Sequence, residues 1–259
     1  MKKHLVMLHG FGCDSRVFSS LGHKLSKNHD VLMVDIPGHG QTKEMFGDFS
    51  FSALAILHAL DVHLKEPYHL LGWSMGGEIA LEMFKQKERA KCKDPRCSHE
   101  HEHGENPIGS LMLLSTTPRF VASDDFKIGM NPAVFNKFRK GIKNDYKKTM
   151  DDFYARMFSD AEDAGKYLTD LRSQTPSRST LQACMESFER FDERKALPLI
   201  EVPVLILAGD KDAVIDPKAS MYLAQEIKGS TIRVLQGAGH APHLTREAEV
   251  ISELEQFLG

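Results

Sequence analysis

The sequence predicts an α/β protein built on a mainly parallel, doubly wound sheet, with a helical segment inserted after the central strands. From the start of the chain, short apolar runs alternate with amphipathic runs of helical length, the pattern of strands joined by crossover helices. The run at 204–209 is apolar throughout, as expected for a parallel strand that is covered on both faces. Between about residues 118 and 198 the alternation stops and only helical periodicity remains.

Each element follows from a local pattern in a chain of 259 residues. Short, mainly apolar runs predict the strands, at residues 5–8, 31–34, 68–71, 111–114, 204–209 and 232–235. Apolar residues spaced three and four apart predict helices, at residues 51–64, 78–84 and 251–258. A chain of this length supports one large domain, so these elements are expected to share a single core.

The inserted segment shows helical periodicity in two stretches. Apolar residues recur along it at Val134, Phe138, Ile142, Met150, Phe153, Tyr154, Met157 and Phe158. We expect residues 1–118 and 196–259 to form the α/β core, and residues 119–195 to form a helical lid over the strand ends. Some of the aromatic residues would build the interior of the lid, and others would line an apolar pocket.

The most informative motif is Gly-Trp-Ser-Met-Gly at residues 72–76, which joins a predicted strand to a predicted helix. A strand, G-x-S-x-G and a helix in this order form a nucleophile elbow, a sharp turn that lifts a serine hydroxyl clear of the backbone. The glycines let strand and helix pack closely. Ser74 is therefore the predicted nucleophile, and a glycine turn without chemistry is the alternative interpretation.

An acid and a base follow Ser74 in the order that such sites use, serine then aspartate then histidine. The buried strand at 204–209 leads into Asp212, and the strand at 232–235 leads through a glycine-rich turn into His240. We expect His240 to take the serine proton. Asp212 would hold the imidazole in the required tautomer and stabilise the imidazolium.

Neighbouring residues compete for both roles. Asp210 and Asp216 flank Asp212, but the Gly-x-x-Asp spacing favours Asp212, and the other two are interpreted as a turn residue and a helix cap. His243 competes with His240, but it follows a proline and is predicted to lie at the start of the last helix.

The predicted strand at 5–8 ends in His-Gly-Phe-Gly at residues 9–12. Acyl transfer needs two backbone N–H groups directed at the oxygen that becomes negative. By analogy with other nucleophile-elbow proteins, these donors are the N–H groups of Phe11 and Met75. His9 is a further candidate base, and we interpret it as a histidine that braces the glycine loop through hydrogen bonds.

Composition argues against several classes of protein. The formal net charge of −3 is unlike that of a general nucleic-acid binder. No apolar run approaches the ~20 residues of a membrane span, and no signal peptide is predicted, because the chain enters a core strand almost at once. The 4 cysteines form no disulfide framework. We expect a cytoplasmic monomer with reduced thiols and no cofactor.

One segment does not fit the scaffold. Residues 91–106 interrupt the link between the elbow helix and the next strand, where short connections are usual. The segment carries side chains with metal-ligand chemistry, at Cys92, Cys97, His99, His101 and His103. Their spacing matches no closed zinc motif, so a solvated loop is the preferred interpretation. A bound metal would be structural or adventitious, because the predicted triad needs none.

Together these motifs resemble the α/β-hydrolase superfamily, and within it the pimeloyl-[acyl-carrier-protein] methyl ester esterases of biotin synthesis. Motifs shared with many ester hydrolases indicate the superfamily, at residues 8–12, 35–40 and 72–77. The biotin-pathway family is indicated by Trp73, by the lid pattern at 153–157, and by the stretch that follows the central strand, at 115–120, 125–126 and 129–130. The resemblance covers nearly the whole chain except residues 91–106.

The resemblance implies hydrolysis of the methyl ester of a pimeloyl chain on acyl carrier protein. It places the triad at Ser74, Asp212 and His240. It also implies a wider set of substrate contacts, from Phe11, Ser74, Met75, Phe153, Tyr154, Ala155, Arg156, Met157 and His240. The family usually has tryptophan at the position of Phe11 and often leucine at that of Met75, and both replacements here are apolar.

Other functions fit the same triad. A generic short-chain carboxylesterase would use it, and so would a menaquinone-pathway lyase, although the lyase needs an arginine-rich pocket and the apolar lid favours an acyl ester. From another class, a slow-turnover receptor of the same fold can keep an intact triad. Burst kinetics with p-nitrophenyl esters separates these functions, because a receptor stalls after one turnover.

Basic residues gather in one part of the predicted lid. Between residues 137 and 156, seven basic residues stand against three acidic ones, a balance of +4 on a chain of net charge −3. The basic residues are Lys137, Arg139, Lys140, Lys143, Lys147, Lys148 and Arg156. Acyl carrier proteins are strongly acidic, so this face is predicted to steer the carrier to the pocket. A solvated helix face is the alternative.

Ester hydrolysis is expected to survive exhaustive chelation with EDTA, and also deletion of residues 92–105. The predicted triad carries out ester hydrolysis without a metal ion, so chelation should not affect it. A connection on the surface tolerates changes in length, so the deletion should not affect it either. Hydrolysis of a p-nitrophenyl ester before and after each treatment measures this. A loss of activity with EDTA that zinc restores would instead give the Cys/His segment a function.

Overall fold

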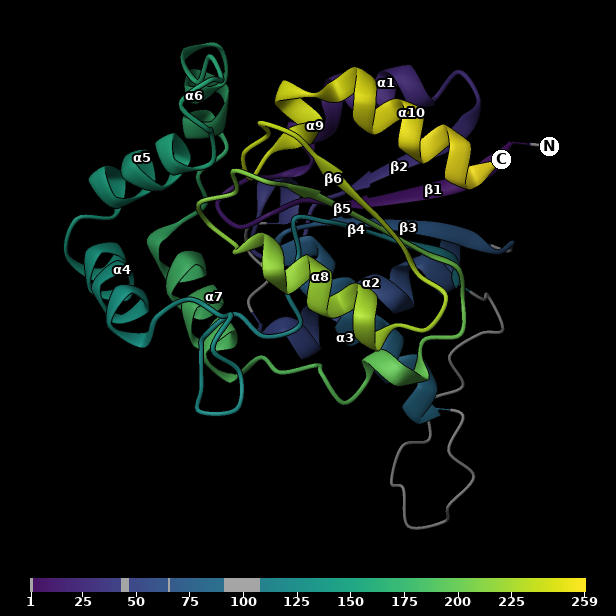
Figure 1. Ribbon diagram of the computed structural model, residues 1–259, viewed down its shortest axis with the longest axis horizontal. Coiled ribbons are helices and arrows are strands. Elements are labelled where there is room, and N and C mark those ends of the chain that lie inside the picture. Colours follow the sequence, from purple (N-terminus) through teal and green to yellow (C-terminus); the bar gives the residue numbers. More distant parts are fainter. Residues whose placement is uncertain (1, 43–46, 65, 91–107) are drawn as a thin grey trace.

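The computed structural model describes the chain apart from residues 1, 43–46, 65 and 91–107, and a parallel sheet lies at its centre (Figure 1). In the described residues the sheet is 6-stranded: β1 (Lys3–Leu8), β2 (His29–Val34), β3 (Tyr68–Trp73), β4 (Ile108–Leu114), β5 (Val204–Gly209) and β6 (Thr231–Leu235). Every pairing is parallel. Each predicted strand lies within one of these strands, so the predicted fold class is confirmed.

The strand order β2-β1-β3-β4-β5-β6 reverses once, between β1 and β3. The chain runs from β1 outward to β2, then returns to the other side of β1 to form β3, and later strands are added on that side. In open α/β sheets the loops at such a reversal diverge and leave a crevice at the C-terminal strand ends. The loops after β1 and β3, which contain Phe11 and Ser74, follow the two strands at this reversal.

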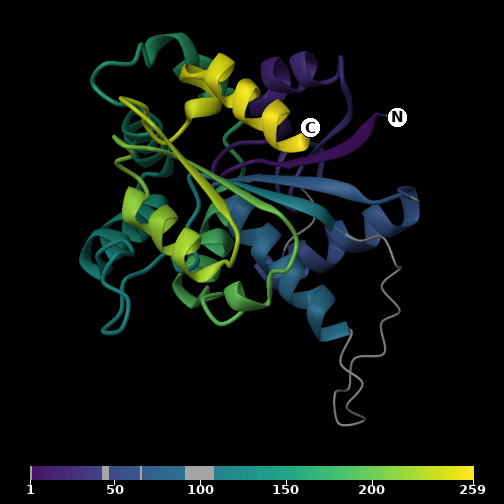
Figure 2. The same cartoon turned by 45° about the vertical axis from the view of Figure 1, so that its right-hand side comes forward.

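Helices cover both faces of the sheet (Figures 1 and 2). On one face lie α1 (Ser19–Leu25) and α10 (Glu247–Leu258), and on the other lie α2 (Phe49–His63), α3 (Met75–Ala90) and α8 (Pro217–Glu226). The three predicted core helices correspond to α2, α3 and α10, and each begins a few residues earlier than its apolar pattern. The sheet is therefore doubly wound, as predicted.

The centre of the sheet is its most completely buried part. Every residue of β5 is buried, and β3 buries all of its residues except His69. In contrast, β2 lies at one edge, where Leu32 and Met33 are 41% and 37% exposed. Because apolar burial is the main favourable contribution to folding, the loops that follow β3 and β5 start from the most firmly packed strands.

The inserted segment forms helices beside the C-terminal ends of the strands, on the left of Figure 1. These helices are α4 (Pro132–Asn144), α5 (Tyr146–Arg156), α6 (Gly165–Ser173) and α7 (Arg178–Arg190). The ends of the segment are tied together, because Glu193 N–H donates to the Pro118 carbonyl at 2.9 Å and Arg119 pairs with Asp192. These contacts support the division into residues 1–118, 119–195 and 196–259, which stays a prediction.

The described residues hold no helix that is both long enough and apolar enough to cross a membrane. The predicted Cys/His segment at 91–106 lies outside the described residues. The other two cysteines, Cys13 and Cys184, are buried free thiols, which agrees with their interpretation as small apolar residues. Burial raises the pKa of Cys184 to about 12, so this thiol stays protonated at neutral pH.

Candidate active site

Ser74 stands on a tight turn between β3 and α3. Its φ of 54° lies in the left-handed region, which costs a non-glycine residue about 1–3 kcal/mol. The turn is held because Ser74 N–H donates to the Leu114 carbonyl at 2.9 Å. A Cβ on Gly76 would lie 2.1 Å from the Leu8 carbonyl oxygen, so only glycine lets α3 approach β1 this closely. The serine is thus fixed in a conformation that projects its hydroxyl from the turn.

Ser74, His240 and Asp212 form one hydrogen-bonded chain. Ser74 Oγ lies 2.9 Å from His240 Nε2, and His240 Nδ1 lies 2.7 Å from Asp212 Oδ2. Asp212 Oδ1 accepts hydrogen bonds from the N–H groups of Val214 and Ile215, at 2.8 and 2.9 Å. The carboxylate is therefore oriented to accept the Nδ1 proton, which leaves Nε2 free to accept the serine proton. The His240 and Asp212 side chains are 0% and 2% exposed.

The competing aspartates have other partners. Asp210 Oδ1 accepts from Gly237 N–H at 2.5 Å, so it joins the loop after β5 to the loop after β6. Asp216 caps α8 by accepting from Lys218 N–H at 2.9 Å. These are the turn and capping roles that the sequence predicted.

His9 braces the loop after β1. Its Nε2 accepts from Ile36 N–H at 3.0 Å, and its Nδ1 donates to the Gly10 carbonyl at 2.9 Å. Burial lowers the pKa of His9 to about 4, so the ring is neutral near pH 7. Since both nitrogens are engaged, the bracing interpretation fits and His9 has no free nitrogen to act as a base.

The predicted position of His243 needs a correction. It lies in a separate short helix, α9 (Pro242–Thr245), because the chain leaves helical geometry before α10 begins. Its ring packs against Trp73 and Phe18, with ring centroids 4.4 and 5.1 Å apart. Burial, with a smaller effect from His240, lowers the pKa of His243 to about 3. His243 is thus a neutral packing residue, placed next to Trp73 and outside the hydrogen-bonded chain.

Phe11 and Met75 carry the predicted oxyanion donors. In the described part of the chain, neither backbone N–H donates a hydrogen bond. The loop of Phe11 is pressed against the elbow strand, since a Cβ on Gly10 would lie 2.8 Å from the Trp73 ring. Both N–H groups remain available to an incoming oxygen, and the oxyanion assignment stays a prediction.

An aromatic cluster joins the loop after β1 to the inserted helices. Phe11 lies against Phe138 of α4, Phe153 of α5 and Phe188 of α7, with centroid distances of 5.9, 5.4 and 5.6 Å. These edge-to-face contacts suit aromatic quadrupoles. Phe188 was missed from the sequence, although its spacing from Leu181 is a helical repeat that signals a buried position.

The other predicted substrate residues, in α5 and at its C-terminal end, divide into two groups. Tyr154 is buried, and its hydroxyl donates to the Gly12 carbonyl at 2.5 Å and bonds Thr175 at 2.8 Å. Met157 is also buried. In contrast, Ala155 and Arg156 are exposed. The phenol of Tyr154 is thus engaged in structure, and it ties α5 to the loop after β1.

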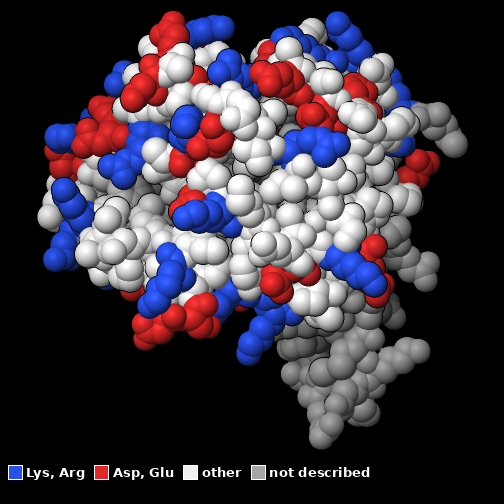
Figure 3. All heavy atoms as spheres, viewed as in Figure 1, with Lys and Arg blue, Asp and Glu red and all other residues white. Residues whose placement is uncertain are grey.

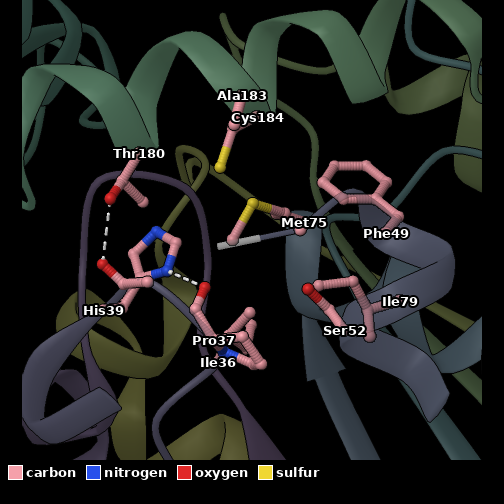
Figure 4. Close-up of a pocket in the computed structure, with 12 residues that line it drawn as sticks. Ile36, Pro37, His39, Phe49, Ser52, Met75, Ile79, Thr180, Ala183 and Cys184 are labelled. Carbon is pink, nitrogen blue, oxygen red and sulfur yellow. Dashed lines mark hydrogen bonds between the residues drawn. The ribbon is translucent and has the colours of Figure 1, made fainter. Parts of the chain in front are cut away.

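Two cavities adjoin these residues. One, of about 450 Å³, is lined by residues 127–131 and Arg156 from the inserted segment and by residues 212–217 after β5. A smaller one lies behind Met75, where the Met75 and Cys184 side chains point toward each other below α7 (Figure 4). His39 also lines it, and burial lowers the pKa of this ring to about 3, so the smaller cavity has an uncharged wall.

The chain matches the sequence model of the alpha/beta hydrolase family over residues 5–253. The chain belongs to this family. A pimeloyl-[acyl-carrier protein] methyl ester esterase from Neisseria meningitidis serogroup C is 32% identical over 257 residues, covering 97% of this chain and 91% of that protein. Another from Nitrosomonas europaea is 27% identical over 253 residues, covering 96% and 92%. This α/β-hydrolase is a carboxylic ester hydrolase.

Solved structures share the fold. An esterase from Exiguobacterium antarcticum has a TM-score of 0.84 at 23% identity, covering 98% of this chain and 91% of its own. MenH from S. aureus has a TM-score of 0.80 at 24% identity, covering 99% and 93%. At such identities the α/β-hydrolase architecture is shared, and the substrate is a separate question.

His243→Phe is expected to weaken the loss of stability in mild acid. The unfolded chain protonates His243 near its ordinary pKa of 6.5, whereas the folded chain does so near pH 3. Its contribution to stability is therefore present above pH 6.5 and is lost as pH falls below it, by about 1.4 kcal/mol between pH 7.5 and 5.5. Urea unfolding at both pH values measures the difference. An identical pH dependence in variant and wild type would contradict a neutral buried ring.

Proposed function

We propose that this α/β-hydrolase cleaves the methyl ester of a pimeloyl chain carried on acyl carrier protein, through an acyl-enzyme on Ser74. The observation that carries the proposal is the hydrogen-bonded chain from Asp212 through His240 to Ser74. The names of the relatives that match nearly the whole chain indicate the substrate. The predicted monomeric state and cytoplasmic location accompany this proposal as predictions.

The geometry suits a two-step acyl transfer. His240 Nε2 takes the Ser74 proton as Oγ attacks the ester carbonyl, and the N–H groups of Phe11 and Met75 stabilise the resulting oxyanion. The imidazolium, stabilised by Asp212, returns the proton to the methoxide, which leaves as methanol. His240 then activates a water that attacks the acyl-enzyme and releases the free carboxylic acid.

The aromatic cluster favours an acyl chain over a multiply anionic substrate. Phe11 and Phe153 are buried in this cluster of rings, an apolar environment that suits methylene groups and disfavours anionic groups. Among the residues that line the larger cavity, Arg156 is the one arginine. This lining does not favour a menaquinone-pathway lyase, which needs an arginine-rich pocket, and the lyase and a generic short-chain carboxylesterase both stay alternatives.

The contacts of the inserted helices refine the proposed carrier surface. Arg139 pairs with Glu189 at 2.7 Å, and Lys148 pairs with Asp152 at 2.6 Å, so part of the predicted basic charge is neutralised. Figure 3 shows both signs of charge interleaved over this side of the molecule. The remaining basic residues are exposed and have no ion pair within the described chain: Lys137, Lys140, Lys143, Lys147 and Arg156.

Three of these lysines form the carrier stripe, which we define as Lys137, Lys140 and Lys143. They recur every three residues along α4, so they lie along one side of this helix. Phe138 of the same helix contacts Phe11. An acidic carrier that docks on the carrier stripe would therefore bring its tethered chain to the helix that helps form the acyl pocket.

Ser74→Ala and His240→Ala are each expected to lower hydrolysis of the carrier-bound methyl ester by several orders of magnitude, because a triad acts as a unit. Asp212→Asn should cost roughly 10⁴-fold through loss of the required tautomer. Asp210→Asn is the matched control and should cost far less. Methanol release measures the rates, and circular dichroism checks the fold.

Near-wild-type turnover by Ser74→Ala would overturn the proposed mechanism. A greater loss in Asp210→Asn than in Asp212→Asn would overturn the choice of acid. The wild-type gene should also rescue growth of a biotin auxotroph that lacks this esterase, and the Ser74→Ala gene should not. A single burst of product without turnover would favour the receptor alternative.

Reversal of the carrier stripe to glutamate is expected to slow hydrolysis of the carrier-bound ester about tenfold at low salt, chiefly through slower association. The defect should shrink as salt rises, because ions screen exposed charges. Hydrolysis of a free p-nitrophenyl ester should be unchanged. Equal losses on both substrates would mean that the lysines support the structure of the helix instead.

A matched control reverses Lys2, Lys27 and Lys228, which are exposed and precede β1, β2 and β6. These lysines lie at the opposite end of the parallel sheet from Ser74, and their reversal changes the net charge by the same amount. The control is expected to keep the wild-type rate on the carrier-bound ester. An equal defect in the control would assign the effect to net charge alone.

A further inference from the structure

The loop between α5 and α6 is bonded directly to the loop that carries His240. His240 N–H donates to the Met157 carbonyl at 2.7 Å. The preceding N–H, that of Gly239, donates to Oε2 of Glu162 at 3.1 Å. Two consecutive peptide groups of the histidine loop are therefore held by the inserted segment, and one of the two acceptors is a side chain.

Glu162 serves both loops with a single oxygen. Its Oε2 also accepts from Ser159 N–H at 2.7 Å, which closes a turn within the inserted segment. Ser159 in turn donates through Oγ to the Gly237 carbonyl at 2.9 Å. Hydrogen bonds from N–H groups to a carboxylate are roughly twice as strong as neutral ones. Glu162 is thus a charged acceptor at the junction of the two loops.

The histidine loop needs such anchors because of its composition. Gly237 has a φ of 72°, and glycine widens the range of conformations that an unanchored loop samples. At Gly239 the two loops approach so closely that a Cβ would lie 2.8 Å from Glu162 Oε2. From the other side, Trp73 Nε1 donates to the His240 carbonyl at 2.8 Å. His240 is therefore held between the elbow strand and the inserted segment.

We propose that Glu162 is a positioning residue for His240, and that through it the inserted helices and His240 move as one unit. The inference rests on the proposed role of His240 as the general base. Phe153 and Met157, which precede Glu162, belong to the segment that contacts the acyl pocket and the histidine loop. A shift of this segment therefore shifts the imidazole of His240 relative to Ser74. Displacements of about 1 Å in a catalytic group can lower the rate about 10²-fold.

The first test compares Glu162→Ala with two other variants on p-nitrophenyl butyrate. Glu162→Ala is expected to lower kcat about tenfold or more with KM changed less than about twofold, because the base is displaced while the acyl pocket persists. Glu162→Gln keeps an oxygen acceptor and should retain most of kcat. Asp163→Ala removes the same charge from an exposed neighbouring residue and should match the wild type.

A second readout does not depend on ester chemistry. Amide hydrogen exchange in peptides that cover residues 236–243 should rise in Glu162→Ala and stay at the wild-type level in Glu162→Gln and Asp163→Ala. Hydrogen exchange reports on the order of the histidine loop whether or not Ser74 is the nucleophile. If Ser74→Ala kept its activity, the proposed mechanism would fail, but the exchange measurement would still test the role of Glu162.

Several outcomes would overturn the positioning role. An unchanged kcat in Glu162→Ala would do so, whether or not exchange rises, because loop order would then not matter for His240. Unchanged exchange in Glu162→Ala would mean that other bonds hold the loop. Equal effects in Asp163→Ala would assign the result to charge, and a Glu162→Gln variant as impaired as Glu162→Ala would exclude simple hydrogen-bond acceptance.

Discussion

The close approach of α3 to β1 is the constraint on which the site depends. A Cβ on Gly76 would collide with the Leu8 carbonyl oxygen, so the helix can begin this near the strand only through glycine. This approach brings the N-terminus of α3, with the Met75 N–H and the positive end of the helix dipole, beside the loop that follows β1. Ser74 takes its left-handed conformation at the same turn. The nucleophile and both proposed oxyanion donors therefore depend on one packing contact.

The inserted helices have two physical roles: they form one side of the aromatic cluster around Phe11, here called the wall, and they hold the loop of His240 in place, here called the brace. As a wall they bring Phe138, Phe153 and Phe188 against Phe11. As a brace they hold the His240 loop, through the Met157 carbonyl and the Glu162 carboxylate. Since the same short segment takes part in both, the shape of the proposed acyl pocket and the position of the proposed base are not independent.

A contact with a carboxylate distinguishes His240 from the other buried histidines of the site. Burial lowers the pKa values of His9 and His243 to about 4 and about 3, so these rings remain neutral and serve as packing and hydrogen-bonding groups. His240 is equally buried, but it contacts the carboxylate of Asp212 at 2.7 Å. In a medium of low dielectric constant, a carboxylate at this distance is what allows an imidazole to accept a proton during a reaction.

The sequence by itself determined the parallel sheet and the elbow, and it predicted the residues of the hydrogen-bonded chain that joins Ser74, His240 and Asp212. These depend on local patterns: apolar runs, the strand-turn-helix context of Ser74, and the spacing of Asp212 and His240 after their strands. The tertiary structure alone decided that Phe188 joins the aromatic cluster, that Glu189 neutralises Arg139, and that Glu162 holds the histidine loop. These contacts join residues far apart in the chain, and no local periodicity specifies which distant side chain or N–H group will be the partner.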